Sequence, residues 1–229
     1  MIFGRKKRDA VVESPIEDDL DPATGEQQDP AGDEWAGLDS QDWRAEGPFD
    51  ISEVDLDADD VARIDLGALV LTPMPEMGLQ LQVDEESQHV VATLATKGES
   101  AIEMAVFAAP KAASMLAEVR AAMIAETEAS GGTATVAQGP FGAEIRQVLP
   151  LTGQNGERLL HVSRIWLVQG PRWLLRGVLF GKAAQQLELE GETLELFEFF
   201  ANTVVRRDSH PAAAGAIIPM RVPQGMMQA

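Results

Sequence analysis

The sequence predicts an α+β protein: an antiparallel β-sheet sandwich covered by two helices and preceded by a disordered acidic arm. The charge distribution predicts the arm, because residues 1–60 hold nineteen acidic and five basic side chains, whereas residues 61–229 hold eighteen and thirteen. An acidic, apolar-poor segment cannot bury enough surface to offset its chain entropy. Short polar connectors between alternating apolar runs predict antiparallel strands, and two segments with helical spacing predict the helices.

The expected domain boundaries follow from this division. Residues 1–60 form the acidic arm, residues 61–208 form one α+β binding domain, and residues 209–229 form a C-terminal tail. About 150 residues is the size of an ordinary single domain with a substantial core. At the end of the arm, residues 47–56 contain apolar side chains, and we expect this segment to pack back onto the domain.

Four strands are predicted before the first helix. The clearest is the segment 78–84, in which alternation places Leu79, Leu81 and Val83 on one face, as in a half-buried strand. Short polar connectors separate the segments, and such connectors predict an antiparallel meander. The four predicted strands cover residues 68–71, 78–84, 89–96 and 101–107.

Helical spacing appears first after Pro110. Apolar residues recur there at intervals of three and four, and Gly131-Gly132 supplies a left-handed stop, so we predict a helix over residues 111–129. A second helix is predicted over much of residues 183–202, where glutamates occupy the side opposite the apolar stripe. Between the helices, strands are predicted over residues 133–138, 143–150, 159–169 and 173–181.

Two resemblances follow from this pattern. The element order is similar to that of the Mog1/PsbP-like fold, whose members are chiefly binding and assembly factors. The motifs GPFDISEVD at residues 47–55, FAAP at 107–110 and GPRWLLRG at 170–177 resemble the actinobacterial family named domain of unknown function 3710, over residues 47–224. This second resemblance implies an intracellular protein of a family without an established activity, and it supplies no catalytic residues.

The sequence lacks the motifs of most enzyme classes. Without cysteine there are no disulfides, thiol nucleophiles or thiolate metal sites. The three histidines are single and far apart, and no phosphate-binding or dinucleotide-binding glycine motif is present. We therefore expect no catalytic residues, no cofactor and no metal, and we expect the protein not to be an enzyme.

One cluster of tryptophans and arginines stands out. If Gly170-Pro171 closes a tight hairpin, Trp173 lies opposite Val168, and alternate residues of both strands share one face. Two tryptophans beside three arginines are able to bind an anion, a carboxylate-bearing peptide or a stacked base. The alternative is that the tryptophans are core residues and the arginines pair with glutamates. The candidate binding residues are Arg164, Trp166, Arg172, Trp173 and Arg176.

Trp35 and Trp43 are large apolar groups within the acidic arm, and we expect them to act as its anchors. Such groups are typical of segments that fold against an apolar, basic surface. That surface belongs either to a partner or to the chain's own Trp/Arg cluster, which the arm then masks. Plain disorder of both tryptophans is the remaining interpretation.

Residues 5–8 are basic, and they follow Ile2 and Phe3. We interpret them as a solvated start of the chain, with a transient contact to a membrane or a partner as the alternative. No apolar region of a signal peptide follows them, and no apolar stretch of roughly 18 residues is present. We therefore expect a cytoplasmic protein without membrane insertion.

The expected function is a non-enzymatic intracellular protein-binding or adaptor module, whose acidic arm recruits a protein partner or masks the Trp/Arg groove. One alternative is a nucleic-acid-linked regulatory protein, although a net charge of −19 disfavours binding to phosphates. Another is an enzyme or binder of a small anionic ligand, which needs a pocket that residue spacing does not reveal. The identity of the partner and the oligomeric state stay open.

Overall fold

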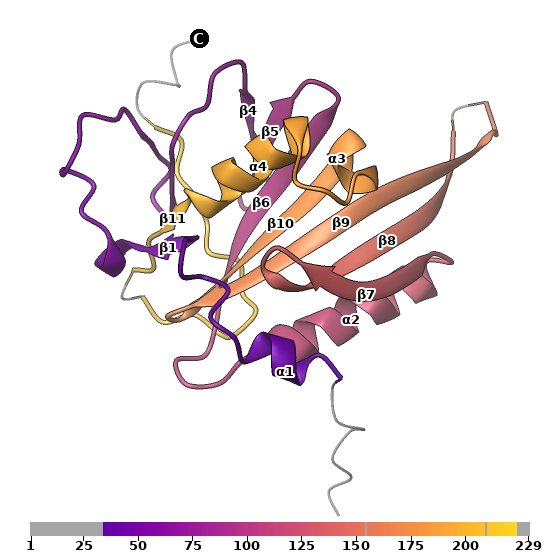
Figure 1. The fold of residues 1–229 in the computed structure, drawn as a ribbon, viewed down its shortest axis with the longest axis horizontal. Coiled ribbons are helices and arrows are strands. Elements are labelled where there is room, and N and C mark those ends of the chain that lie inside the picture. Colours follow the sequence, from indigo (N-terminus) through magenta and orange to yellow (C-terminus); the bar gives the residue numbers. More distant parts are fainter. Residues whose placement is uncertain (1–33, 154, 209, 224–229) are drawn as a thin grey trace, which may run out of the picture. The chain divides into compact units, whose positions relative to one another are not determined.

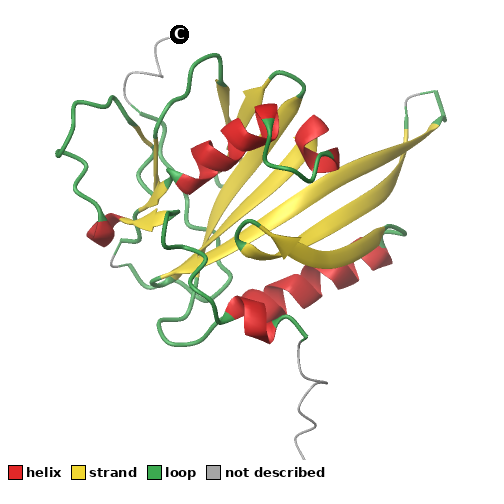
Figure 2. Ribbon diagram, in the orientation of Figure 1, coloured by secondary structure: helices red, strands yellow, loops and turns green. Residues whose placement is uncertain are grey.

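The structure, a computed structural model, describes residues 34–153, 155–208 and 210–223. This described part contains two β-sheets and four α-helices, of which α2 and α4 are the longest (Figures 1 and 2). Most strand pairs are antiparallel, and the predicted α+β class is confirmed. None of the helices in the described ranges is long and apolar enough to cross a membrane.

The larger sheet has seven antiparallel strands in the order β4-β5-β6-β10-β9-β8-β7. Apolar runs bounded by turn residues predict each of these strands to within two residues at either end. The strands are β4 (Gly78–Val83), β5 (Val90–Lys97), β6 (Ser100–Ala108), β7 (Thr133–Gly139), β8 (Gly142–Thr152), β9 (Arg158–Gly170) and β10 (Trp173–Gly181).

The smaller sheet joins segments that lie far apart in the chain. Its order is β1-β11-β3-β2, and β1 runs parallel to β11 while the other two pairs are antiparallel. The strand predicted at residues 68–71 is β3, whereas the other three have two residues each and are too short for alternation to reveal. The bounds are β1 (Phe49–Asp50), β2 (Ile64–Asp65), β3 (Leu69–Leu71) and β11 (Val204–Val205).

Helix α2 (Leu116–Ala129) begins five residues later than the predicted start at residue 111. The side chain of Gln169 accounts for the difference. Its Oε1 accepts a hydrogen bond from Met115 N and its Nε2 donates to Ala113 O, both at 2.8 Å. These bonds hold the segment before α2 in a non-helical conformation, so a tertiary contact overrides the local spacing.

The single helix predicted over residues 183–202 is divided into α3 (Lys182–Gln185) and α4 (Gly191–Ala201). Arg164 donates hydrogen bonds to the carbonyls of Ala183 and Gln186 at the end of α3. The guanidinium thereby satisfies carbonyl groups that a helix end leaves without partners, and it fixes where α3 ends. The remaining helices are α1 (Ala36–Asp39) and the 3₁₀ helix η1 (Ile51–Glu53).

The seven-stranded sheet separates two hydrophobic cores. Successive side chains of a strand point to opposite faces, so Trp166 and Leu175 enter the larger core, and Ile165 and Leu174 enter the smaller one. The larger core is completed by α3, α4 and the smaller sheet, and we call this side the closed face. The smaller core lies under α2, on the opposite side of the sheet (Figure 1).

The domain boundary predicted at residue 60 needs correction, because residues 34–60 belong to the folded unit. Asp39 on α1 forms an ion pair with the buried Arg120 of α2 at 2.8 Å, and β1 pairs with β11. The expected packing of residues 47–56 onto the domain is therefore present. The rest of the predicted arm, residues 1–33, lies outside the described residues.

The predicted C-terminal tail also contributes to the fold. Beyond Met104 the strands β5 and β6 separate, and the chain after residue 214 runs between them. Ile218 N donates to the carbonyl of Val106 on β6, and Met220 N donates to the carbonyl of Val90 on β5, both at 2.8 Å. Because Ile218 and Met220 are buried, this segment is part of the larger core rather than a separate tail.

Candidate functional site

One half of the sheet face under α2 is uncovered. Helix α2 packs mainly against β7, β8 and β9 and shares the smaller core with Leu174 and Val178 of β10, so in the described part no helix is centred over β6 and β5 on this face (Figure 1). The strand register places one set of partly exposed side chains on this half. We call it the open face, and its residues are Leu94, Ala101, Glu103, Phe107, Arg176 and Phe180.

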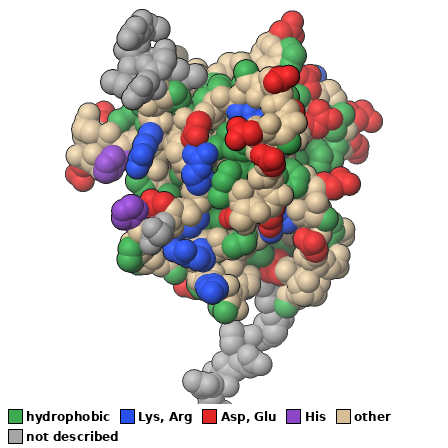
Figure 3. Space-filling model, turned by 90° about the vertical axis from the view of Figure 1, so that its left-hand side faces the viewer, with side chains coloured by type: hydrophobic (Ala, Val, Ile, Leu, Met, Phe, Trp, Pro, Cys, Tyr) green, Lys and Arg blue, Asp and Glu red, His purple; other side chains and the backbone are tan. Residues whose placement is uncertain are grey.

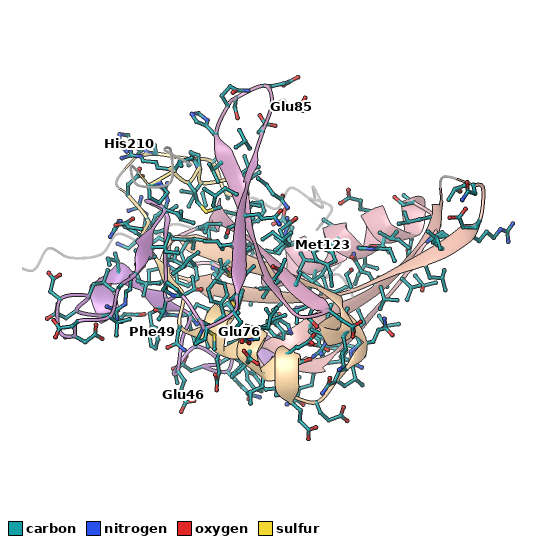
Figure 4. The ribbon with its side chains drawn as sticks, turned by 90° about the horizontal axis from the view of Figure 1, so that it is seen from above. Glu46, Phe49, Glu76, Glu85, Met123 and His210 are labelled. Carbon is teal, nitrogen blue, oxygen red and sulfur yellow. The ribbon has the colours of Figure 1, made fainter. Side chains whose placement is uncertain are left out.

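Two adjoining cavities of about 230 and 160 Å³ lie between α2 and the open face. Met123 on α2 and Arg176 on β10 line both cavities, and Figure 4 places Met123 on α2 beside the strands. The smaller cavity is almost entirely apolar, with Phe107 on its wall. The larger one adds the carboxylates of Glu103 and Glu126. Together they form a groove that is apolar at one end and is lined at the other end by both apolar and polar side chains, including these carboxylates.

Arg176 is the polar centre of this groove. Its Nη2 donates to Glu103 Oε1 at 3.2 Å, and its guanidinium lies over the ring of Phe107 at 5.2 Å. Gln82 Nε2 donates to the second carboxylate oxygen of Glu103 at 2.9 Å. The Nε of Arg176 is buried and has no hydrogen-bond partner among the described residues. A buried donor without a hydrogen-bond partner destabilises the fold, because it has lost its hydrogen bonds to water. A small movement of the Arg176 side chain would let this N–H donate to a carbonyl of a bound ligand and remove that cost.

A strip of exposed apolar side chains on the β8–β9 hairpin extends the groove beyond α2. The hairpin of β8 and β9 projects past its neighbours (Figure 1), and Leu151 pairs with Leu159 near its tip, each 48% exposed. Leu149, two residues back, lines the larger cavity, and the His161 ring lies 5.2 Å from Phe180. Exposed apolar side chains that form a continuous surface are typical of interaction sites.

Three of the five predicted binding residues are instead core residues of the closed face. Trp166 is 1%, Arg164 2% and Trp173 0% exposed. Glu144, itself buried, accepts hydrogen bonds from Arg164 Nη2 at 2.9 Å and from Trp166 Nε1 at 3.0 Å. These residues do not line an open groove, which corrects that prediction. The alternative interpretation, core tryptophans and an arginine paired with glutamate, describes them instead.

The hairpin register requires a second correction, whereas Arg172 lies in the turn as predicted. Trp173 pairs with Gly170 rather than with Val168, a shift of two residues. Pro171 suits the first turn position because its φ is fixed near −65°, and Arg172 has the positive φ of 66° that the second position of a type II turn requires. A shift of two residues leaves each side chain on its original face, so the predicted grouping by face is correct.

The two proposed anchors, Trp35 and Trp43, lie in the folded unit. Trp43 packs against Gly142 at the start of β8, and its Nε1 donates to the carbonyl of Leu38 at 2.8 Å. Trp35 is half-buried in the turn that precedes α1. With the ion pair between Asp39 and Arg120, these contacts hold residues 35–43 against the chain's own domain. The predicted arm contacts the Trp/Arg cluster further along the chain, at Trp173.

Side chains from residues 44–53 hold Trp173 in place on the closed face. Its Nε1 donates to Asp50 Oδ2 at 2.8 Å, and Arg44, which is paired with Glu53 at 2.6 Å, lies over its ring. Burial raises the pKa of Asp50, but hydrogen bonds from Ser52 and Trp173 outweigh it, so that the pKa lies below its ordinary value. The hydrogen bond from Arg44 likewise lowers the pKa of Glu53.

Sequence reasoning identified Arg176 but missed the residues around it. The signal was present: Glu103 is the one charged residue of β6, and Arg176 is the one charged residue of β10. Their facing positions depend on β6 and β10 being neighbours, although more than sixty residues separate them. Alternation within one strand does not contain that information.

The described residues define an α+β protein with one closed and one half-open sheet face, and they contain no cluster of three metal-ligating side chains. A family model described as "Protein of unknown function (DUF3710)" matches residues 47–229, and the chain belongs to this family. The resemblance predicted for residues 47–224 is confirmed. No curated protein and no solved structure matches the chain, so the Mog1/PsbP-like likeness and an actinobacterial origin stay predictions.

Proposed function

We propose that the protein is a cytoplasmic, non-enzymatic protein-binding or adaptor module, and that its open face receives an apolar segment of a protein partner. The observation that carries the proposal is the groove: partly exposed Phe107 and Phe180 flank two cavities beside α2. Binding sites of this kind are concave and mostly apolar, with a few polar groups that fix orientation. Arg176 and Glu103 supply such groups.

The charges around the groove indicate what the partner segment carries. Glu103 and Glu126 line the larger cavity, and residues 34–223 hold twenty-eight acidic and fourteen basic side chains. Opposite charge on a partner steers association toward such a surface. We therefore propose a segment with apolar side chains and lysine or arginine. The same carboxylates disfavour an anionic ligand as the occupant.

Nucleic acid is a weaker candidate partner. Neutralising phosphates requires a concentrated basic surface. On the face shown in Figure 3, lysine and arginine side chains are interspersed with carboxylates and uncharged groups. Arg44, Arg63 and Arg206 are each paired with a carboxylate in the described part.

A peptide-display selection on the full chain tests the proposal. We expect selected peptides to combine apolar and basic residues and to bind with lower affinity to the Ala101→Glu variant. Ala101 pairs with Phe180 on the open face and is only partly buried, so the new carboxylate occupies the surface without removing a core side chain. The affinity loss is expected to be about tenfold or more, as for an unpaired charge buried at an interface.

The matched control is Ala121→Glu, which introduces the same group on the exposed side of α2. Peptides that bind the open face retain their affinity for this variant. A selection that yields no binders, or binders with equal affinity for both variants, contradicts the proposed function. Melting curves for both variants show whether either change disturbs the fold.

A further inference from the structure

Strand β7 is an unpaired edge of the seven-stranded sheet. It pairs with β8 on one side, and among the residues that the structure describes no backbone hydrogen bond reaches its other side. Its seven residues, Thr133–Gly139, therefore present a row of free N–H and C=O groups. Such a row is a template for another strand.

Strand β7 itself lacks the devices that usually protect an edge, and the nearest proline, Pro140, lies just beyond its end in the turn to β8. Natural edge strands carry charged side chains, prolines or bulges that prevent pairing. Residues 129–143 contain no charged residue, which makes them the longest uncharged stretch in a chain that is 24% charged. Glu128 and Glu144 bracket the stretch. The register of β7 with β8 is regular from Thr133 to Gly139, so no bulge protects the edge.

The opposite edge, β4, is protected. Its pairing with β5 shifts register between Gln82 and Val83, as at a bulge. Acidic residues flank it: Glu76 lies before the strand, and Glu85 lies at the tip of the hairpin that follows (Figure 4). An antiparallel pairing of β4 with its own copy brings these two acidic ends together, and like charges that face each other across strands are destabilising.

We infer that β7 pairs with β7 of a second copy of this chain, antiparallel about a two-fold axis at Val136. Thr135 then lies opposite Ala137 of the partner subunit, and the two seven-stranded sheets become one continuous sheet. A two-fold interface uses the same patch on both subunits, and in this patch no like charges meet. The surface is distinct from the open face, so the inference stands apart from the proposed function.

The test measures the mass of the full chain by light scattering after size exclusion. We expect twice the chain mass of 24.7 kDa for the natural sequence. The Thr135→Lys variant places charges on both sides of the axis, and we expect it to weaken self-association at least about tenfold, because edge lysines block strand pairing. Thr135 is exposed, so its replacement leaves the core unchanged.

Gln80→Lys is the matched control, because Gln80 is exposed on the other edge strand. It is expected to stay dimeric. Raising the salt concentration is expected to strengthen the dimer, since salt screens the repulsion between two acidic chains. A monomeric natural chain, a dimer that Thr135→Lys leaves intact, or equal loss in both variants overturns the inference. Unchanged melting of Thr135→Lys shows that a loss of dimer is not a loss of fold.

Discussion

The two faces of the seven-stranded sheet are built from alternating residues of the same strands, yet they have different environments. On β10, Trp173 and Leu175 are fully buried against the closed face, whereas Arg176 and Phe180 on the open face are partly exposed. The backbone of a strand places side chains on its two faces in the same way, so it does not by itself cause this difference in exposure. The difference arises because α4 and the smaller sheet bury β10 on one face, while on the other face α2 buries Leu174 but leaves Arg176 and Phe180 partly exposed.

Each face also carries a glutamate–arginine pair, and the two pairs have different consequences. Glu144 and Arg164 are 1% and 2% exposed as side chains, with a separation of 2.9 Å. Glu103 and Arg176 are 21% and 29% exposed, with a separation of 3.2 Å. Burial makes the first pair a structural requirement, because neither charge has water as an alternative partner. The second pair keeps access to solvent and is free to rearrange around a ligand.

The largest expected effect follows from removing one glutamate from each face. Glu144→Ala leaves Arg164 charged and buried, and we expect the free energy of unfolding to fall by about 3–5 kcal/mol. Glu103→Ala is the matched variant, with an expected loss of at most about 1 kcal/mol for a partly exposed pair. Urea unfolding of both variants measures the two values. Similar losses contradict the distinction between the faces.

A smaller effect is expected from adding one methyl group to a glycine of each face. A Cβ at Gly177 meets Phe200 Cε2 at 2.6 Å, and overpacking of this kind costs about 1–3 kcal/mol. A Cβ at Gly78 meets only the hydroxyl of Thr96, which is able to rotate away, so Gly78→Ala is expected to stay within about 0.5 kcal/mol of the natural chain. Thermal unfolding compares the two. A larger loss for Gly78→Ala shows that the open face is packed more tightly than its exposure indicates.

The smallest expected effect is the loss of stability at acidic pH that arises from Asp50 and Glu53, in the segment that contacts Trp173. The pKa values of Asp50 and Glu53 are lower in the fold than their ordinary values. Such carboxylates stabilise the fold fully above the unfolded-state pKa of about 4, and the contribution is lost as the pH falls through the folded-state pKa. We expect the free energy of unfolding to decrease below about pH 4 and the decrease to be smaller in Glu53→Gln.

Urea unfolding between pH 7 and pH 3 checks this expectation. The gap between the natural chain and Glu53→Gln is expected to be widest near neutral pH and to narrow in acid. Parallel curves for the two proteins show that the interaction between Arg44 and Glu53 contributes nothing to stability, as is true of many surface ion pairs.

The sequence by itself determined the seven strands of the large sheet, the two longest helices and the assignment of side chains to faces. These features are periodic within one segment, so each segment contains its own signal. Even the error of two residues in the β9–β10 register left Trp173 on the correct face, because the side-chain period is two. For the candidate site, this reasoning identified Arg176 and no other open-face residue.

Only the tertiary structure decided which face is covered, where α3 ends and where the domain begins. Each of these depends on contacts between residues far apart in the chain: Asp39 with Arg120, Arg164 with Gln186, and Phe107 with Arg176. Residues 34–60 look disordered by composition because their carboxylates outnumber their basic residues. They are ordered because arginines and a tryptophan from other segments supply the partners, and a local pattern cannot contain that information.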